Sequence, residues 1–280
     1  MRQLCVIGDP IAHSLSPVIQ NAMIQAAGLD YTYGARRVPA DGTRAWLEQA
    51  VAEGYAGFNA TMPHKERLVP LMDHLSTDGA MYGSVNTVCI KNGELYGYNT
   101  DGDGFLRALR EAGLDPEGRT VLVLGAGGAA RAVVPKLVQG GAEKVFVCNR
   151  TLERAQALCA RESGSRLTPA DLAPGTLRRL AARSSLAVNC TSLGMTGTAG
   201  QFEDLSFVDQ LRGDGGVFDL IYSPRRTRLL ERAERAGLKA VNGLDMLIWQ
   251  AVYALELFAD VELDGPAMVE AARRALEGMV

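Results

Sequence analysis

Two glycines and an alanine, at 125, 127 and 130, directly follow an apolar, β-branched run over 120–124, which gives the spacing G-x-G-x-x-A after an expected strand. Gly125 permits a tight turn, Gly127 lets the backbone approach an anion, and Ala130 allows a helix to pack closely on the strand. The N–H groups at the start of that helix attract negative charge. The pattern therefore predicts a site for the pyrophosphate of a dinucleotide in the middle of the chain.

The residues after the next expected strand, 144–148, indicate which dinucleotide binds. Proteins that bind NAD usually carry Asp or Glu there to hold the 2′-hydroxyl of the ribose. This chain has Asn149 and Arg150, with Arg154 one helical turn further on. Guanidinium groups favour a 2′-phosphate, because arginine can bind phosphate through two parallel hydrogen bonds. A helix start capped by Thr151 with solvated arginines is the alternative, but the position behind the glycine-rich turn favours NADP.

Four polar clusters precede that turn and are candidates for binding and catalysis. They span 8–17, 58–65, 83–88 and 98–105. Two of them directly follow an expected strand, one lies in a strand, and one opens the helix that leads to the glycine-rich half. In open α/β sheets, ligands bind at the carboxyl ends of the strands. The clusters therefore lie where such a fold binds its ligand.

Alternating strand and helix patterns must position these residues. Strands are expected at 3–7, 31–38, 56–60, 85–90, 120–124, 144–148, 186–189, 217–221 and 239–241. Helices are expected near 17–27, 42–53, 64–72 and 103–113, and between most of the later strands. This alternation predicts an α/β fold of parallel sheets covered by helices. Two further helical patterns, 244–258 and 265–278, end the chain and could pack on either half.

Composition sets limits on the class of protein. The 280 residues are 47% hydrophobic, enough for one large or two ordinary domains. A net charge of −3 argues against a general nucleic-acid or membrane surface, although a local basic pocket remains compatible with it. There is no charged-then-apolar leader and no apolar run long enough to span a bilayer. A cytoplasmic protein is therefore expected.

The cysteines and histidines predict neither disulfides nor a metal site. The five cysteines are odd in number, scattered, and mostly inside apolar runs, which favours free thiols in a reducing compartment. The three histidines have no metal-ligand spacing. We therefore expect no metal.

Eight short motifs, in this order, resemble those of the shikimate dehydrogenase family. They are S-L-S-P (14–17), N-x-T-x-P-x-K (59–65), V-N-T (85–87), N-T-D-G-x-G-F (99–105), G-A-G-G-A-A-R-A (125–132), N-R-T (149–151), N-C-T-S-L-G-M (189–195) and G-L-D-M-L-x-x-Q (243–250). The resemblance covers nearly the whole chain. It implies an α/β substrate domain over 1–101, completed by C-terminal helices over 245–280, and a Rossmann NADP domain over 102–244, with the active site in a cleft between them.

The resemblance also implies a reaction and its catalytic residues. The reaction is reversible hydride transfer between C3 of shikimate and C4 of the nicotinamide, which reduces 3-dehydroshikimate in the biosynthetic direction. Lys65 matches the catalytic lysine, whose ammonium can polarise the carbonyl and protonate the resulting alkoxide. Asp101 matches the carboxylate that holds Lys65 and a ring hydroxyl. A solvated lysine and a plain helix N-cap are the alternatives for these two residues, and a capping Asp still has a free oxygen.

The substrate contacts implied by the resemblance come from both ends of the chain. Ser14 and Ser16 match the hydroxyls that bind the substrate carboxylate, and Tyr222 matches a tyrosine that reaches the same group from the cofactor side. Ring hydroxyls are assigned to Asn59, Thr61, Asn86 and Gln250. The residue pattern alone predicts that Ser16, before Pro17, caps a helix, a role compatible with anion binding.

The cofactor contacts implied by the resemblance fall into three groups. The pyrophosphate is assigned to Gly125, Ala126, Gly127, Gly128 and Ala129. The 2′-phosphate is assigned to Asn149, Arg150, Thr151 and Arg154. The nicotinamide side is assigned to Thr191 and Met195, and Gly243 is a further cofactor-binding residue outside these groups.

Other functions are compatible with parts of the pattern. A quinate/shikimate dehydrogenase that uses NAD is disfavoured by the two serines of the first motif and by the arginines after 144–148. A ligand-sensing paralogue without catalysis would be expected to lose Lys65 or Asp101, and this chain keeps both. A folate-linked dehydrogenase would lack the combination of S-L-S-P and N-T-D-G. The expected ligand is a small cyclic hydroxy acid, and the chain is expected to be a monomer or homodimer.

Overall fold

The strands form two sheets of six strands each in the part of the chain that this computed structural model describes, residues 1–161, 164–198 and 200–279. Residues 162, 163, 199 and 280, which the expected domains include, lie outside the described residues. Each sheet belongs to a separate compact unit. The first unit contains Met1–Gly104 and Ile248–Met279, and the second contains Phe105–Leu247.

The first sheet combines parallel and antiparallel strands. Its strands are β1 (Arg2–Gly8), β2 (Tyr31–Arg37), β3 (Gly57–Ala60), β4 (His74–Leu75), β5 (Thr87–Lys91) and β6 (Glu94–Tyr98), in the order β2-β1-β3-β5-β6-β4. The strand β1 is parallel to both β2 and β3, whereas β5 is antiparallel to both β3 and β6. The expectation of purely parallel sheets is therefore wrong for this unit.

A tight hairpin explains the antiparallel pairing. Lys91 pairs with Glu94, so β5 and β6 are joined by the two residues Asn92 and Gly93. Both have positive φ, 55° and 83°, the conformation that two-residue hairpin turns of type I′ require and that Asn-Gly adopts readily. The Asn-Gly pair after a β-branched run is a hairpin signal in the sequence.

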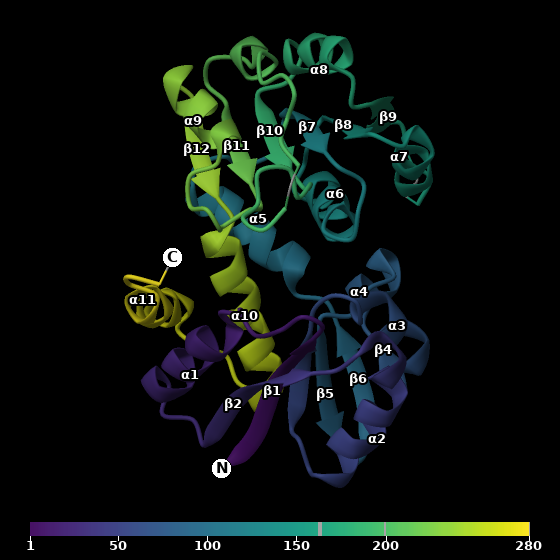
Figure 1. The fold of residues 1–280 in the computed structure, drawn as a ribbon, viewed down its shortest axis with the longest axis vertical. Helices are drawn as coiled ribbons and strands as arrows, with labels where there is room; N and C mark the ends of the chain where they lie inside the picture. Colours follow the sequence, from purple (N-terminus) through teal and green to yellow (C-terminus); the bar gives the residue numbers. More distant parts are fainter. Residues whose placement is uncertain (162–163, 199, 280) are drawn as a thin grey trace. The chain divides into compact units, whose positions relative to one another are not determined.

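Helices from both ends of the chain complete the first unit (Figure 1). They are α1 (Ser16–Ala26), α2 (Thr43–Ala52), α3 (Lys65–Leu68), α4 (Thr77–Tyr82), the start of α5 (Asp101–Glu111), most of α10 (Leu244–Ala259) and α11 (Gly265–Ala275), with short 3₁₀ turns at Ala40–Gly42 and Val69–Leu71. The helix α11 packs on α1, and the Tyr31 hydroxyl donates to the carbonyl of Phe258 in α10. The two C-terminal helices therefore pack on the first half, a choice that the sequence pattern leaves open.

Side-chain alternation gives the first sheet two different faces. Cys5, Ile7 and Phe58 point into a core with Trp46 of α2, whose ring meets Phe58 edge-on at 5.9 Å. The other face packs against α10: a Cβ on Gly57 would lie 2.7 Å from the ring of Phe258. Asn59 has the same parity as Gly57, so its side chain belongs to this second face.

The second sheet is entirely parallel. Its strands are β7 (Thr120–Leu124), β8 (Lys144–Asn149), β9 (Leu167–Asp171), β10 (Leu186–Asn189), β11 (Gly216–Asp219) and β12 (Lys239–Asn242), in the order β12-β11-β10-β7-β8-β9. The covering helices are α6 (Ala130–Gln139), α7 (Leu152–Cys159), α8 (Pro174–Ala181) and α9 (Arg228–Arg235), with a 3₁₀ turn at Val208–Gln210. This is the doubly wound order of a Rossmann fold, whose strand order reverses between β7 and β10.

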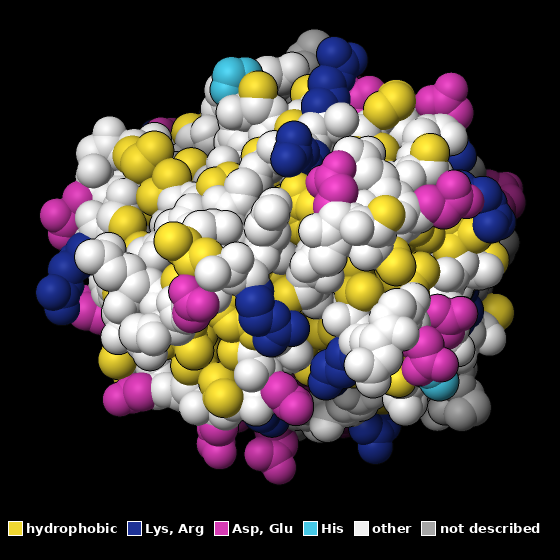
Figure 2. Space-filling model, turned by 90° about the horizontal axis from the view of Figure 1, so that it is seen from below, with side chains coloured by type: hydrophobic (Ala, Val, Ile, Leu, Met, Phe, Trp, Pro, Cys, Tyr) yellow, Lys and Arg dark blue, Asp and Glu magenta, His cyan; other side chains and the backbone are white. Residues whose placement is uncertain are grey.

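No helix among the described residues is both long enough and apolar enough to cross a bilayer. On the face drawn in Figure 2, acidic and basic side chains are interspersed, with hydrophobic side chains between them.

Candidate active site

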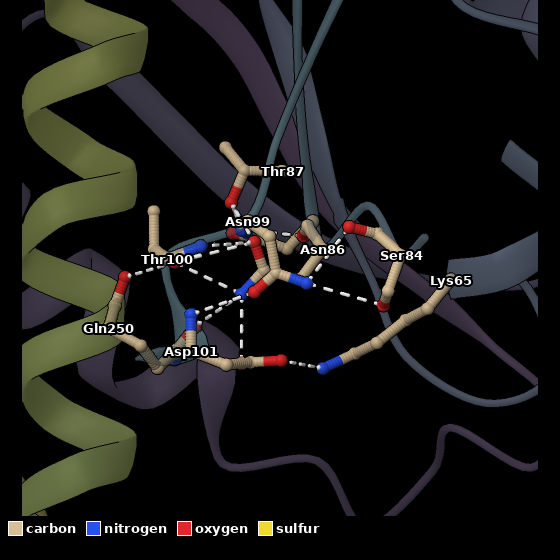
Figure 3. Close-up of polar contacts among 9 residues, drawn as sticks. Lys65, Ser84, Asn86, Thr87, Asn99, Thr100, Asp101 and Gln250 are labelled. Carbon is tan, nitrogen blue, oxygen red and sulfur yellow. Dashed lines mark hydrogen bonds and ion pairs between the residues drawn. The ribbon is translucent and has the colours of Figure 1, made fainter. Parts of the chain in front are cut away.

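Lys65 and Asp101 form a direct ion pair. Each is the first residue of a helix, α3 for the lysine and α5 for the aspartate. Lys65 Nζ lies 2.6 Å from Asp101 Oδ2, and the two side chains are 30% and 16% exposed (Figure 3). A charge-assisted bond of this length fixes both groups while leaving part of the ammonium accessible.

The second oxygen of Asp101 is held from the sheet. Asn86, next to β5, donates from Nδ2 to Asp101 Oδ1 at 2.9 Å. The backbone N–H of Asp101 donates to Asn99 Oδ1 at 3.0 Å, so Asn99 satisfies a donor at the helix start. The Asp101 carboxylate accepts from Lys65 and Asn86. It therefore does more than the alternative role of a plain helix N-cap requires.

Gln250 joins this cluster from α10. Its Oε1 accepts from Asn86 Nδ2 at 3.4 Å, and its backbone carbonyl accepts from Thr100 Oγ1 at 2.9 Å. Thr100 in turn donates its backbone N–H to Asn86 Oδ1 at 2.9 Å. The structure thus brings Lys65, Asp101, Asn86 and Gln250 together, although they come from three distant parts of the sequence.

Asn59 is more deeply buried than the ion pair. It is 8% exposed, and its Nδ2 donates to the Asn86 carbonyl at 3.1 Å and to Thr87 Oγ1 at 2.9 Å. Its Oδ1 accepts from the hydroxyl of Tyr33 at 2.7 Å. Both N–H donors of this amide are therefore used inside the protein.

Thr61 lies where β1 and β3 end side by side. Its backbone N–H donates to the Ile7 carbonyl at 2.9 Å, and its side chain is half-buried. A Cβ on Gly8 would lie 2.6 Å from Thr61 Cγ2, so a side chain at position 8 would displace this threonine.

Ser14 and Ser16 shape the turn into α1. The helix starts at Ser16, and the residue before it, Leu15, is helical in conformation with no side-chain cap. Instead, Ser14 Oγ accepts from the Ser16 backbone N–H at 3.3 Å. The prediction that Ser16 caps the helix is wrong, because the helical turn already includes Leu15 and Ser14 provides the accepting oxygen. Both serines are half-buried.

The glycine-rich turn after β7 has room for an anion on one side only. Gly125 has φ +104°, and a Cβ there would lie 2.9 Å from Thr191 Cγ2. A Cβ on Gly127 or Gly128 would have no heavy atom within 4 Å, and both glycines are exposed. The backbone is thus closed against β10 and open on its outer side, which fits the approach of a pyrophosphate.

Asn149 connects this turn to the end of β8. Its Oδ1 accepts from the Ala126 backbone N–H at 3.2 Å, and its Nδ2 donates to the Thr151 carbonyl at 2.8 Å. Thr151 is the N-cap of α7 without a side-chain cap bond. Arg150 and Arg154 are exposed beside it, so their guanidinium groups are accessible to a phosphate.

The remaining predicted cofactor residues lie on loops of the second unit. The Thr191 hydroxyl donates to Asn189 Oδ1 at 2.7 Å, Ala129 is the N-cap of α6, and Met195 is 38% exposed. A Cβ on Gly243 would lie 2.0 Å from the Leu220 carbonyl oxygen, so no side chain fits there. Tyr222 is half-buried, and burial raises the pKa of its hydroxyl.

Several residues of the polar network are missing from the sequence-based assignment. Ser84 holds Asn99 through its backbone carbonyl at 2.9 Å, and Thr87, Thr100 and Asn99 flank assigned residues within the same motifs. In the second unit, the buried Asp219 accepts from Asn189 Nδ2 at 2.9 Å and from the Thr227 hydroxyl at 2.6 Å. Burial raises the pKa of Asp219. Polar residues inside apolar strands are the signal that could have identified these partners.

His64 is a structural residue despite its position beside Lys65. It is fully buried, with Nδ1 2.9 Å from Thr43 Oγ1 and Nε2 2.8 Å from the Val38 carbonyl. Burial lowers the pKa of this imidazole. The ring donates from Nε2 to the Val38 carbonyl, and Nδ1 faces the hydroxyl of Thr43, which also donates to the Ala40 carbonyl at 3.0 Å.

The cysteines are free thiols in an apolar environment. Burial raises the pKa of Cys5, Cys89 and Cys148 to about 12, so these thiols stay protonated at neutral pH. Within the described ranges, no three His, Cys, Asp or Glu side chains are grouped as metal ligands.

Comparison with known proteins gives the same family for both units. The family model of the shikimate dehydrogenase substrate binding domain matches residues 6–88, and that of shikimate / quinate 5-dehydrogenase matches residues 108–193. The shikimate dehydrogenase (NADP(+)) of Geobacter sulfurreducens is 42% identical over 265 residues, which cover 93% of this chain and 92% of that protein. The enzyme of the same name from Alkaliphilus metalliredigens is 38% identical over 266 residues, which cover 94% and 93%.

A solved structure is similar over the same length. The shikimate 5-dehydrogenase of Thermus thermophilus, in complex with NADP(H) and shikimate, matches with a TM-score of 0.87 and 37% sequence identity. The match covers 99% of this chain and 100% of that one.

Proposed function

The chain belongs to the shikimate dehydrogenase family, and on this basis we propose that it reversibly reduces 3-dehydroshikimate to shikimate with NADPH. The activity is that of an oxidoreductase, and the cofactor is NADP. The ligand is a small molecule, and a cyclic hydroxy acid fits a site of hydroxyl, amide and ammonium donors.

The observation that carries this proposal is the ion pair of Lys65 and Asp101. Reduction of a ketone leaves an alkoxide, so a proton donor must stand beside the carbonyl oxygen. The Lys65 ammonium, held at 2.6 Å by Asp101 and still 30% exposed, is such a donor.

The proton follows a simple route in each direction. When bound, NADPH supplies the hydride that reduces the carbonyl carbon. Lys65 Nζ gives its proton to the carbonyl oxygen, and Asp101 keeps the amine oriented throughout. In the oxidation of shikimate, the neutral amine of Lys65 accepts the hydroxyl proton. Asn86 holds Asp101 in place through its bond to Oδ1.

We assign the other substrate contacts by chemistry. Ser14 and Ser16 offer hydroxyls near the start of α1 for the carboxylate, and the protonated hydroxyl of Tyr222 is a further donor for that group. Ring hydroxyls would be bound by Thr61, Asn86 and Gln250. Apart from Tyr222, these contacts come from residues 1–101 and 245–280, which would form the substrate domain.

Residues 102–244, which contain most of the second unit, would bind NADP. The open outer side of Gly127 and Gly128 suits the pyrophosphate, and the exposed Arg150 and Arg154 suit the 2′-phosphate. Thr191 and Met195 would lie on the nicotinamide side, and Gly243 would be a further cofactor contact.

A matrix of initial rates tests the proposal. Shikimate and quinate are each assayed with NADP and with NAD, using the wild type, Lys65→Ala and Lys91→Ala. Shikimate with NADP should give the highest kcat/KM, and Lys65→Ala should lower kcat by about 10²- to 10⁴-fold, the usual size of an acid–base contribution. Light scattering on the same samples separates a monomer from a homodimer.

Lys91→Ala is the matched control, because Lys91 pairs at 3.7 Å with Asp260 and is 45% exposed. This variant should keep the wild-type rate. Preference for quinate or NAD would overturn the assigned specificity but not the catalytic pair. Absence of turnover with every combination would favour a ligand sensor.

A further inference from the structure

A directed chain of hydrogen bonds runs from β2 to the catalytic carboxylate. Tyr33 Oη donates to Asn59 Oδ1 at 2.7 Å, and Asn59 Nδ2 donates to Thr87 Oγ1 at 2.9 Å. Thr87 Oγ1 then donates to Asn86 Oδ1 at 2.8 Å, and Asn86 Nδ2 donates to Asp101 Oδ1 at 2.9 Å. Every donor is on the Tyr33 side of its bond, and the last acceptor, Asp101, is the partner of Lys65. Figure 3 shows the end of this path, from Thr87 through Asn86 and Asp101 to Lys65.

Two backbone groups fix the direction of this chain. The Asn59 amide faces the Asn86 carbonyl, which can only accept, so its NH₂ group must be on that side. The Asn86 amide faces the Thr100 N–H, which can only donate, so its oxygen must be on that side. The Thr87 hydroxyl then has one possible arrangement, accepting from Asn59 and donating to Asn86.

The four residues that lead to Asp101 along this hydrogen-bond path are all buried. Tyr33, Asn59, Asn86 and Thr87 are 5%, 8%, 2% and 0% exposed. Burial raises the pKa of Tyr33 well above its usual value, so its hydroxyl remains a donor. Aligned hydrogen bonds in a low-dielectric interior polarise one another, and here the positive ends of the dipoles point toward Asp101.

We propose that Tyr33 and Thr87 are positioning residues for the Lys65–Asp101 pair, acting through Asn59 and Asn86. Asn59 then acts through Asn86, consistent with the use of both its N–H donors inside the protein. The inference rests on the proposed function, because it assigns these residues to the same catalytic pair. It extends the site by a strand that no motif of the sequence marks.

The same strand provides a matched control. Tyr31 is also a buried tyrosine of β2, at 8% exposure, and its hydroxyl donates to the Phe258 carbonyl at 3.0 Å. Tyr31→Phe and Tyr33→Phe each remove one buried hydroxyl from β2. Only Tyr33→Phe removes a donor from the hydrogen-bond path that leads to Asp101.

The first arm of the test is kinetic. Tyr33→Phe should lower kcat about three- to tenfold, the range that a coupled residue outside the ligand contacts produces, with the KM for NADP unchanged. Tyr31→Phe should keep the wild-type kcat. Thr87→Val should behave like Tyr33→Phe, and Thr87→Ser, which keeps the hydroxyl, should restore the rate. Equal kcat in the two tyrosine variants, or no difference between Thr87→Val and Thr87→Ser, would overturn the inference.

The second arm needs no turnover. Competitive acetylation with acetic anhydride, followed by mass spectrometry, compares the reactivity of Lys65 with that of Lys91 in the ligand-free proteins. Loosening Asp101 should raise labelling of Lys65 roughly two- to fivefold in Tyr33→Phe, the size of one weakened ion pair, and leave it unchanged in Tyr31→Phe. Unchanged labelling in Tyr33→Phe would overturn the inference even if kcat fell.

The two arms separate this inference from the proposed function. If the wild type does not turn over shikimate, the proposed function fails. The labelling ratio alone then decides whether the hydrogen-bond path from Tyr33 affects the reactivity of Lys65. If the wild type is active and Tyr33→Phe matches Tyr31→Phe in labelling, the function stands and the inference fails.

Discussion

The Lys65–Asp101 ion pair has a well-defined geometry but contributes little to the stability of the fold. A partly exposed pair adds about 0–1 kcal/mol to the free energy of unfolding, yet this one is bonded at 2.6 Å and supported by Asn86. This geometry suits the proposed role of Lys65, which is to place an ammonium group beside the carbonyl of the substrate. A change that removes its charge should affect the reaction far more than the fold.

Asp101→Asn tests this separation. The amide keeps the shape of the carboxylate but no longer holds Lys65 as an ion, so kcat should fall about 10²-fold or more. The melting temperature should move by no more than about 3 °C, the shift that about 1 kcal/mol produces in a chain of this size. Steady-state kinetics and thermal unfolding measure the two quantities.

Asp260→Asn is the control for Asp101→Asn. Asp260 also pairs with a lysine, Lys91 at 3.7 Å, and its φ of 57° is one that Asn tolerates readily. It should leave both quantities unchanged. A large loss of stability in Asp101→Asn with little loss of kcat would mean that the pair is structural.

His64 should make the free energy of unfolding depend on pH. Burial lowers its pKa in the folded chain, whereas the unfolded chain keeps a value near 6.5. At a pH between the folded and unfolded pKa values, only the unfolded state binds the proton. The free energy of unfolding is therefore highest above pH 6.5 and declines as the pH falls below it. Urea unfolding at pH 7.5 and 5.5 measures the decline, which should be smaller in His64→Gln.

The exposed His74 provides the comparison for this pH dependence. Its side chain is 52% exposed beside Glu94, so His74→Gln should retain the decline of the wild type between pH 7.5 and 5.5. Equal declines in His64→Gln and the wild type would assign the acid sensitivity to other groups.

The sequence marks the residues that we propose as catalytic, but it does not mark every residue that supports them. Lys65 and Asp101 were assigned from motifs, and Asn86 and Gln250 from the same resemblance. Tyr33 was not, because its contact with Asn59 depends on the register in which β1 lies between β2 and β3. In that register Tyr33 aligns with Leu4 and Asn59 with Val6, so the two side chains share a face but lie diagonally across a strand.

Two nearby glycines in the turn between β7 and α6 have different roles, one in folding and the other in binding. Gly125 has φ +104° and a Cβ position 2.9 Å from Thr191, so Gly125→Ala should destabilise the second unit by about 1–3 kcal/mol. Gly127 lacks both constraints, and a methyl group there would occupy only the open side of the turn. Gly127→Ala should therefore keep the melting temperature while raising the Kd for NADP about tenfold or more, because the methyl blocks the approach of the pyrophosphate.

Calorimetry with NADP and thermal unfolding distinguish these effects, with Gly175→Ala as the control. A Cβ on Gly175, in α8, also has no heavy atom within 4 Å, so this variant should keep the Kd for NADP and should not lower the melting temperature, because Ala favours a helix more than Gly does. Unchanged NADP affinity in Gly127→Ala would contradict the assignment of the turn to the pyrophosphate.

Elements were predictable where periodicity was long and apolar. The strands at 120–124 and 186–189 have the predicted bounds. The strand β4 has only two residues, which is too short to form a pattern, and β9 is a half-exposed edge strand that contains Pro169. The hairpin of β5 and β6 was missed although Asn92–Gly93 marks it, because the alternation of strands and helices suggested parallel pairing throughout.

The first unit is built from both ends of the chain, and hydropathy could not have shown this. The apolar faces of α10 and α11 could cover either sheet, so the decision depends on specific contacts. Gln20 Nε2 donates to the Ala251 carbonyl at 3.0 Å, and Thr100 Oγ1 donates to the Gln250 carbonyl at 2.9 Å. These bonds join three segments that are far apart in sequence and give the site its residue from α10.

A division of labour between the two units predicts that each ligand protects its own unit against hydrogen exchange. At 100 times its Kd, a ligand stabilises the state that binds it by about 2.7 kcal/mol, which slows exchange there about 100-fold. NADP alone should protect peptides from 120–132 and 144–155, and shikimate alone should protect peptides from 57–68 and 84–102. In Gly127→Ala, with a Kd about tenfold higher, the first protection should fall to about tenfold at the same NADP concentration, and the second should be retained. Protection of 120–132 by shikimate alone would contradict the division, because the substrate would then be bound by the unit assigned to the cofactor.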